Sequence, residues 1–302
     1  MAEERCREIA DRLAEPLLAT ATHELGWILL EHPAAWGRNA LLESGLEPAF
    51  AEALDARAKR LGLRVLLIRQ PGRRDVSAGR ACFLVHGGEG RASIEAATVA
   101  DPADLLAADL EALARGEPTG LGRAHEGALH LVCTHGKRDA CCALHGAPVA
   151  RALAAARPAT TWECSHVGGH RFAANVVSFP DALLFGRVLP GEAVDVAAAY
   201  EAGRVSLDHF RGRCSHAEPV QAADGLVRRE LGLDGIGDVA LAGVPRVEED
   251  GSAIEAEVRL RVPDGELVAR VRGVPGEPRP ASCGAAKLER PVAWALASLS
   301  RG

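Results

Sequence analysis

The sequence predicts an α/β fold followed by a small α+β appendage. Along residues 1–213, apolar strand-like runs alternate with helical patterns, which is typical of a layered α/β structure. The ranges 1–120 and 121–213 each begin with a strand, a helix and a second strand, so we expect two structurally related halves. In residues 214–302 a helical pattern precedes shorter alternating segments, which indicates the appendage. These three ranges are the predicted domains.

The first half is expected to contain three strands and two helices. Apolar runs predict strands at residues 26–31, 64–69 and 81–86, and helical spacing of apolar residues predicts helices at residues 47–61 and 101–115. The glycines and the proline of residues 116–122 then indicate a linker to the second half.

The second half is expected to present polar residues at the ends of its strands. Its predicted strands are residues 128–133, 160–164 and 174–179, and its predicted helices are residues 147–156 and 191–203. Pro148 suits the first turn of a helix, where its missing N–H has no partner to lose. A polar loop would therefore lead from Cys133 to Cys141 and Cys142, just past the carboxyl end of a strand, where α/β layers commonly place their chemistry.

The appendage is expected to contain two helices and three strands. Residues 218–231 have a helical pattern, residues 238–243, 253–262 and 266–271 alternate as strands, and residues 285–299 predict a closing helix.

Soft metal ligands are concentrated in the second half. Half of the eight cysteines lie within residues 133–170, together with His135, His166 and His170. Thiolates and imidazoles hold iron-sulfur clusters, zinc or copper, so this density indicates an inorganic centre. In a cytoplasmic protein, eight cysteines are also better explained by metal binding or redox work than by disulfides.

Two motifs in this region carry a family resemblance. The stretch Cys-Thr-His-Gly-x-Arg-Asp-x-Cys-Cys at residues 133–142, followed by Ser-His-Val-Gly-Gly-His at residues 165–170, resembles the sucrase/ferredoxin-like family. Residues 15–21, 27–37 and 64–73 resemble the family's amino-terminal signature in the same order, so the likeness covers about residues 1–215. The cluster domain of that family is similar to thioredoxin-like ferredoxins, which implies thioredoxin-like layers here.

The resemblance implies a [2Fe-2S] cluster that is held by two cysteines and two histidines. By position in the motifs, the implied ligands are Cys133, Cys142, His166 and His170. Because Cys141 is adjacent to Cys142, a shift of one residue would exchange the two. The glycines between the histidines permit a tight loop that turns both imidazoles toward one iron.

The remaining candidates have plainer interpretations. His135 and Cys164 complete Cys-x-His pairs, but these pairs alone do not make a Rieske centre, which also needs a Cys-x-x-His pair. Arg138 and Asp139 either orient the ligand loop or form a solvated ion pair. The scattered cysteines are interpreted as small buried hydrophobic residues: Cys6, Cys82, Cys214 and Cys283. Cys283 precedes the predicted closing helix and could alternatively reach toward the redox centre.

Three functions fit these residues. The preferred one is one-electron transfer by the cluster, with a separate reductase or acceptor protein as the redox partner. A structural zinc site with the same four ligands is the second. A thiol oxidoreductase that uses Cys141 and Cys142, or Cys164, is the third, although the Cys-x-x-Cys spacing of thioredoxin-type sites is absent. No glycosidase-like acid pair and no dinucleotide-binding glycine loop stand out, so we expect an electron carrier rather than an enzyme that turns over a substrate.

Composition excludes two further classes. The net charge is −6, only three of the 35 basic residues are lysines, and aromatic residues make up 4% of the chain, so neither a basic arm nor a base-stacking platform for nucleic acid is expected. No apolar stretch approaches the length of a membrane span, and a cytoplasmic location is therefore expected.

Overall fold

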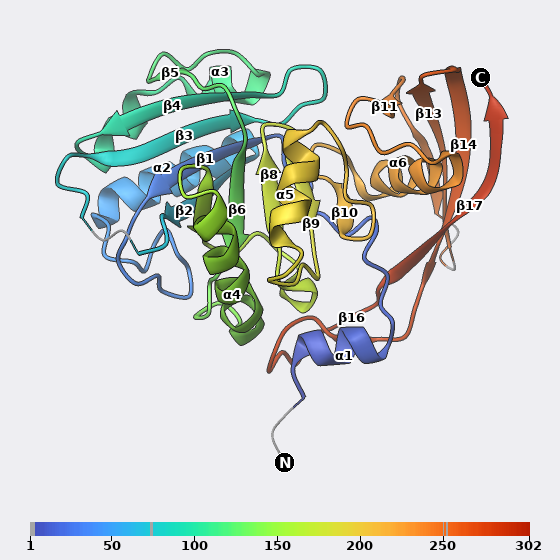
Figure 1. Cartoon of the computed structure of the whole chain (residues 1–302), viewed down its shortest axis with the longest axis horizontal. Coiled ribbons are helices and arrows are strands. Elements are labelled where there is room, and N and C mark those ends of the chain that lie inside the picture. Colours follow the sequence, from blue (N-terminus) through green and yellow to red (C-terminus); the bar gives the residue numbers. More distant parts are fainter. Residues whose placement is uncertain (1–3, 73–74, 250, 252) are drawn as a thin grey trace.

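A computed structural model describes residues 4–72, 75–249, 251 and 253–302, and the fold is built on two sheets (Figure 1). The larger sheet has ten strands in the order β10-β9-β8-β6-β7-β2-β1-β3-β4-β5. The smaller sheet has the order β11-β13-β14-β17, with β12 paired to β13.

The first half of the chain supplies one end of the large sheet. Its elements are α1 (Cys6–Arg12), β1 (Gly26–Glu31), α2 (Pro48–Leu61), β2 (Leu63–Arg69), β3 (Arg80–His86), β4 (Ser93–Val99), η1 (Pro102–Ala107) and α3 (Leu110–Arg115). β1 pairs in parallel with β2 and in antiparallel with β3, and β3 pairs in antiparallel with β4. The strands and the helix that were predicted at residues 26–86 are confirmed.

The second half repeats this arrangement. Its elements are β5 (Arg123–Ala124), β6 (Leu129–Cys133), α4 (Ala140–Ala156), β7 (Thr161–Cys164), η2 (His170–Phe172), β8 (Val176–Phe179), β9 (Leu183–Phe185), α5 (Ala193–Glu201) and β10 (Phe210–Arg213). β6 pairs in parallel with β7 and in antiparallel with β8, which pairs in antiparallel with β9. The halves therefore share one strand-helix-strand topology, which confirms the predicted α/β class with two related thioredoxin-like halves.

The two halves join where β2 pairs in antiparallel with β7. Ile68 stands opposite Cys164, and Arg69 stands opposite Glu163. Rings from strands that are not neighbours in the sheet also meet: Trp27 of β1 lies 5.1 Å from Phe179 of β8, measured between ring centroids. The sheet is therefore curved around a shared apolar core. The predicted domain boundaries at residues 120 and 213 stay predictions.

The appendage packs one helix on the smaller sheet. Its elements are α6 (Glu218–Leu231), β11 (Ala240–Leu241), β12 (Arg246–Glu249), β13 (Ile254–Val262), β14 (Gly265–Pro275), β15 (Arg279–Pro280), β16 (Leu288–Glu289) and β17 (Val292–Arg301). Val258, Leu260, Ala269 and Val271 form the buried face of β13 and β14. The short pair of β15 and β16 extends away from this sheet, and Figure 1 shows β16 beside α1.

The predicted closing helix at residues 285–299 is wrong. The segment contains β16 and most of β17, and β17 pairs in antiparallel with β14. Its larger residues alternate with alanine, and Trp294 and Leu296 pack against the core on one face. The alanines favour a helix, but the alternation and Pro291 just before the strand favour an extended chain. The single helix predicted at residues 101–115 is also wrong, because Asp109 begins α3 as a new helix by accepting the N–H of Ala112 at 2.8 Å.

Candidate metal centre

Cys133 lies at the carboxyl end of β6, where it faces the shared core of the large sheet. It is 1% exposed and stands opposite Cys164 in the parallel pair of β6 and β7. Because parallel neighbours end at the same edge of a sheet, the loops that follow Cys133 and Cys164 start side by side. This topology brings the two sequence motifs together.

Cys142 is placed by a helix that begins earlier than the sequence indicates. The prediction of a loop up to the vicinal cysteines and a helix at residues 147–156 is wrong, because α4 already begins at Ala140. Asp139 caps this helix by accepting the N–H of Cys141 at 2.9 Å. Pro148 lies inside the helix, and the carbonyl that it leaves without a helical partner belongs to the solvent-exposed residue Leu144.

The helical position of the vicinal cysteines separates their thiols. Successive residues of an α-helix point about 100° apart, because 3.6 residues complete one turn. The thiol of Cys142 therefore faces Cys133 and His166, whereas the thiol of Cys141 faces α1. Gly146 allows α4 to approach this closely, since a Cβ at this position would collide with the carbonyl oxygen of Cys133.

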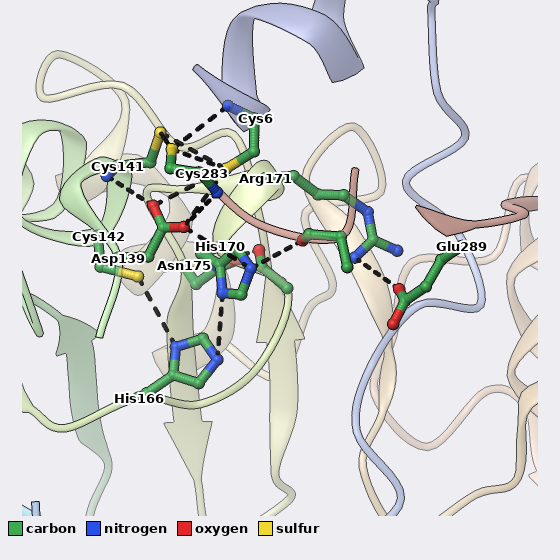
Figure 2. Close-up of polar contacts among 12 residues, drawn as sticks. Cys6, Asp139, Cys141, Cys142, His166, His170, Arg171, Asn175, Cys283 and Glu289 are labelled. Atoms are coloured by element: carbon green, nitrogen blue, oxygen red, sulfur yellow. Dashed lines mark hydrogen bonds and ion pairs between the residues drawn. The ribbon is translucent and has the colours of Figure 1, made fainter. Parts of the chain in front are cut away.

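Three of the four predicted ligands converge tightly. The ligand atoms of Cys133, Cys142 and His166 all lie within 4.8 Å of one another. Sγ of Cys142 is 3.7 Å from Nδ1 of His166, as Figure 2 shows. His170 lies beside this group, with its Nδ1 3.4 Å from Nε2 of His166. The structure thus brings the predicted ligands of both motifs to one place.

His170 is oriented by the C-terminal segment. Its Nε2 donates to the carbonyl oxygen of Ala281 at 2.8 Å. This hydrogen bond fixes the tautomer, so Nδ1 keeps its lone pair on the side of His166. A histidine that binds a metal commonly donates its other N–H in this way.

A buried arginine holds the histidine loop, and the sequence reading did not identify it. Gly168 and Gly169 have positive φ values of 92° and 65°, which turn the chain between the histidines. Arg211 is 1% exposed and donates to the carbonyl oxygen of Gly168 at 3.2 Å and to Oδ1 of Asn175 at 2.8 Å. Asn175 in turn donates to the carbonyl oxygen of Gly169 at 2.9 Å. Asn175 interrupts the apolar run of residues 173–179, which marks it as unusual, whereas Arg211 lies in the mixed sequence Phe-Arg-Gly-Arg of β10, where nothing in the sequence singles it out.

His135 positions the backbone of the loop rather than joining the ligands. Its Nδ1 accepts the backbone N–H of His166 at 3.2 Å, and its Nε2 donates to the carbonyl oxygen of Gly37 at 2.7 Å. Arg138 is exposed, whereas Asp139 is buried. Of the two alternatives for this pair, Asp139 takes the orienting role.

The mutual contact of the two central thiols, Cys133 and Cys142, shifts their pKa values in opposite directions. The hydrogen bond with Cys142 lowers the pKa of Cys133 well below its usual range, and His166 acts in the same direction. The same hydrogen bond, together with burial, raises the pKa of Cys142. The pair thus shares one proton, which metal binding would release. Burial lowers the pKa of His170, so its imidazole is neutral and able to ligate.

The other cysteines divide into two kinds. Cys82, Cys164 and Cys214 are buried in the core, as the sequence predicts. Cys6, Cys141 and Cys283 instead gather with Asp139 in a second group, whose ligand atoms also lie within 4.8 Å of one another. Cys6 and Cys283 are therefore more than isolated buried hydrophobic residues.

Comparison with known proteins gives one family and two distant relatives. The pattern of the sucrase/ferredoxin-like family matches residues 17–212. The chain is 30% identical over 100 residues to altered inheritance of mitochondria protein 32 of Candida glabrata. This match covers 28% of this chain and 32% of the relative. It is 32% identical over 95 residues to the protein of the same name from Meyerozyma guilliermondii. This match covers 28% of this chain and 34% of the relative.

These matches are partial, since the chain spans about a third of the length of the curated relatives that it matches. No solved structure matches the chain. Among the residues that the structure describes, every helix is too short or too polar to cross a bilayer.

Proposed function

Since the chain belongs to the sucrase/ferredoxin-like family, we propose that it is a one-electron transfer protein whose [2Fe-2S] cluster is held by Cys133, Cys142, His166 and His170. The observation that carries the proposal is the convergence of two thiols and an imidazole within 4.8 Å, with a second imidazole beside them. When bound, such a cluster accepts and releases single electrons.

The donor set fits this cofactor. Two thiolates and two neutral imidazoles are the ligands of histidine-ligated [2Fe-2S] centres. The cysteines come from the end of β6 and the first turn of α4, and the histidines come from the connection between β7 and β8. The directions of the pKa shifts support the fit, because contact with Cys142 lowers the pKa of Cys133 and burial lowers the pKa of His170, which favours a thiolate and a neutral imidazole.

The surrounding residues hold the ligands before any metal binds. Arg211 and Asn175 fix the two glycines of the histidine loop, and His135 fixes the backbone N–H of His166. Such contacts orient ligands and tune the electronic properties of a centre. The ligand geometry therefore depends little on the flexible side chains of the protein surface.

Electrons have an accessible entry point at His166. This residue lines an open pocket of about 610 Å³ that also contains the basic residues Arg38, Lys59, Arg64 and Arg138 and the acidic residues Glu24 and Asp55. Arg64 pairs with Glu24 at 2.9 Å and Lys59 pairs with Asp55 at 2.6 Å, so two of the four positive charges have an acidic partner. We place the contact with the redox partner protein on this pocket.

A structural zinc ion is the second candidate for the same residues. The distance of 3.7 Å between Sγ of Cys142 and Nδ1 of His166 favours it. Bonds of about 2.3 Å to sulfur and about 2.0 Å to nitrogen place two tetrahedral ligands of one zinc roughly 3.5 Å apart. The thiol oxidoreductase has no comparable support, since the vicinal thiols face different groups.

The test of the proposal is a pair of matched variants of adjacent cysteines. Cys142→Ala should lose the visible iron-sulfur absorption and the bound iron, whereas Cys141→Ala should keep both. Both variants remove one buried thiol from the same helical turn, so a general effect on folding would appear in each. A full, unshifted iron-sulfur spectrum in Cys142→Ala would contradict the proposed ligand set.

A further inference from the structure

The second group of thiols has the form of a metal site of its own. We propose that Cys6, Cys141, Cys283 and Asp139 bind one Zn²⁺ as a structural site, separate from the [2Fe-2S] centre. The residues come from α1, from the first turn of α4 with its cap, and from the segment between β15 and β16. Figure 2 shows the three sulfur atoms facing one another above the carboxylate of Asp139.

The sulfur atoms form a nearly equilateral triangle. Sγ of Cys141 lies 3.6 Å from Sγ of Cys6 and 3.6 Å from Sγ of Cys283. The third side, between Sγ of Cys6 and Sγ of Cys283, measures 3.5 Å. In a regular tetrahedron the edge is about 1.63 times the distance from centre to corner, so zinc–sulfur bonds of about 2.3 Å require edges of about 3.8 Å. The observed triangle matches one face of such a tetrahedron to within a few tenths of an ångström.

Asp139 lies at the fourth corner. Its Oδ1 and Oδ2 are 3.8 and 3.7 Å from Sγ of Cys6, which is close to the edge expected between a sulfur and an oxygen ligand of one zinc. The same carboxylate accepts the N–H of Cys141 at 2.9 Å and the N–H of Cys283 at 2.9 Å. A carboxylate has about four lone-pair sites, so these bonds orient it and leave capacity for a metal.

The donor chemistry selects zinc. Three thiolates suit Zn²⁺ and Cu⁺, but a carboxylate oxygen is a hard ligand that suits zinc better than Cu⁺. Three thiolates and one carboxylate with Zn²⁺ leave a net charge of −2, the same as in four-cysteine structural zinc sites. Cys6 and Cys141 are buried, whereas Cys283 is partly exposed, which gives the ion a path of entry.

Such a site would fasten the C-terminal segment over the edge of the cluster site. Cys283 lies two residues after Ala281, whose carbonyl oxygen orients His170. The start of the same segment is anchored without any metal, because Arg279 forms an ion pair with Glu15. Arg171 also donates to the carboxylate of Glu15, at 2.7 Å. Loss of the zinc is therefore expected to loosen the segment around Cys283 while the rest of the fold remains.

The experiment measures zinc and iron per chain in the purified protein. We expect one zinc ion per chain in the wild type, and a loss of more than nine tenths of it in both Cys6→Ala and Cys283→Ala with the visible cluster spectrum retained. Cys214→Ala is the matched control, because it removes a buried thiol outside both groups and should keep the zinc. Failure of the cluster proposal would appear separately, as missing iron with the zinc intact.

Cobalt provides a readout that does not require these variants to fold. Titration of Co²⁺ into the zinc-free Cys142→Ala protein should give the intense thiolate-to-cobalt and d–d absorption of a tetrahedral site. Absence of these bands, or zinc contents in Cys6→Ala and Cys283→Ala equal to that of the wild type, would overturn the proposal. The proposal would also be overturned by a wild-type chain that holds no zinc and whose mass under non-reducing conditions is lower by two hydrogen atoms. Such a mass would mean that two of the thiols form a disulfide.

Discussion

Oδ2 of Asp139 lies 3.8 Å from Nε2 of His170. The same oxygen accepts the N–H of Cys283, so a single carboxylate touches both groups of candidate metal ligands. Asp139 also caps α4 and thereby sets the directions of Cys141 and Cys142. The residue that caps α4 thus lies between the two groups that the thiols of Cys141 and Cys142 face.

The contact between Gly146 and Cys133 can be tested by adding one methyl group. A Cβ in Gly146→Ala would collide with the carbonyl oxygen of Cys133, so α4 must move away from β6. We expect a loss of about 1–3 kcal/mol in the free energy of unfolding, as for other overpacked sites, together with reduced iron content. Urea unfolding and iron analysis measure the two effects.

The control for this variant is Gly191→Ala, because a Cβ at Gly191 has no atom within 4 Å. It should leave both quantities close to the wild-type values. Unchanged stability and iron content in Gly146→Ala would show that α4 does not need this close approach to place Cys142.

Buried histidine makes stability depend on pH. His86 is 3% exposed and donates from Nδ1 to the carbonyl oxygen of Leu113 at 3.1 Å, and burial lowers its pKa. Since the folded-state pKa is below the unfolded value of about 6.5, the unfolded chain binds the proton more tightly. The stabilising contribution is therefore complete above about pH 6.5 and is lost as the pH falls through the folded-state pKa.

The measurement for this prediction is urea unfolding between pH 7.5 and 5.5. Wild-type stability should fall toward the acidic end, and His86→Asn, which keeps a donor for Leu113, should show a smaller fall. An equal fall in both proteins would mean that His86 is protonated as easily in the folded chain as in the unfolded chain.

The proposed ligand set of two cysteines and two histidines predicts the reduction potential of the proposed cluster. An oxidised [2Fe-2S] core carries a charge of +2, so two thiolates and two neutral imidazoles leave the site near zero, whereas four thiolates leave it at −2. Adding an electron to a neutral site is easier. We expect a midpoint potential well above the value of about −400 mV of plant-type ferredoxins, measured by optical titration with redox mediators. A value near that of the four-cysteine proteins would argue against histidine ligation.

The sequence predicts the local features of the centre well and the long-range ones poorly. The apolar runs that form β6 and β7 are evident, and with them the placement of Cys133 and of the histidine loop at one sheet edge. The observed start of α4 at Ala140 differs from the prediction because Pro148 favours a later start, although Asp139 is a good capping residue. Sequence spacing therefore left Cys141 and Cys142 interchangeable, and helix geometry separates them.

The second thiol group could not be predicted from spacing. Cys6 and Cys283 are 277 residues apart in the chain, and their contact depends on how β15 and β16 return to α1. That return follows from β17 being a strand that pairs with β14, whereas the alanines of this segment suggested a helix. The contact between Cys6 and Cys283 therefore does not follow from a prediction that places a helix at residues 285–299.

The content of iron, acid-labile sulfide and zinc in anaerobically purified wild-type protein decides between the candidate cofactors. The proposed function predicts two iron and two sulfide ions per chain, with visible absorption that bleaches on addition of one electron per chain. Protein that is colourless, contains no sulfide and carries zinc at Cys133, Cys142, His166 and His170 would contradict it.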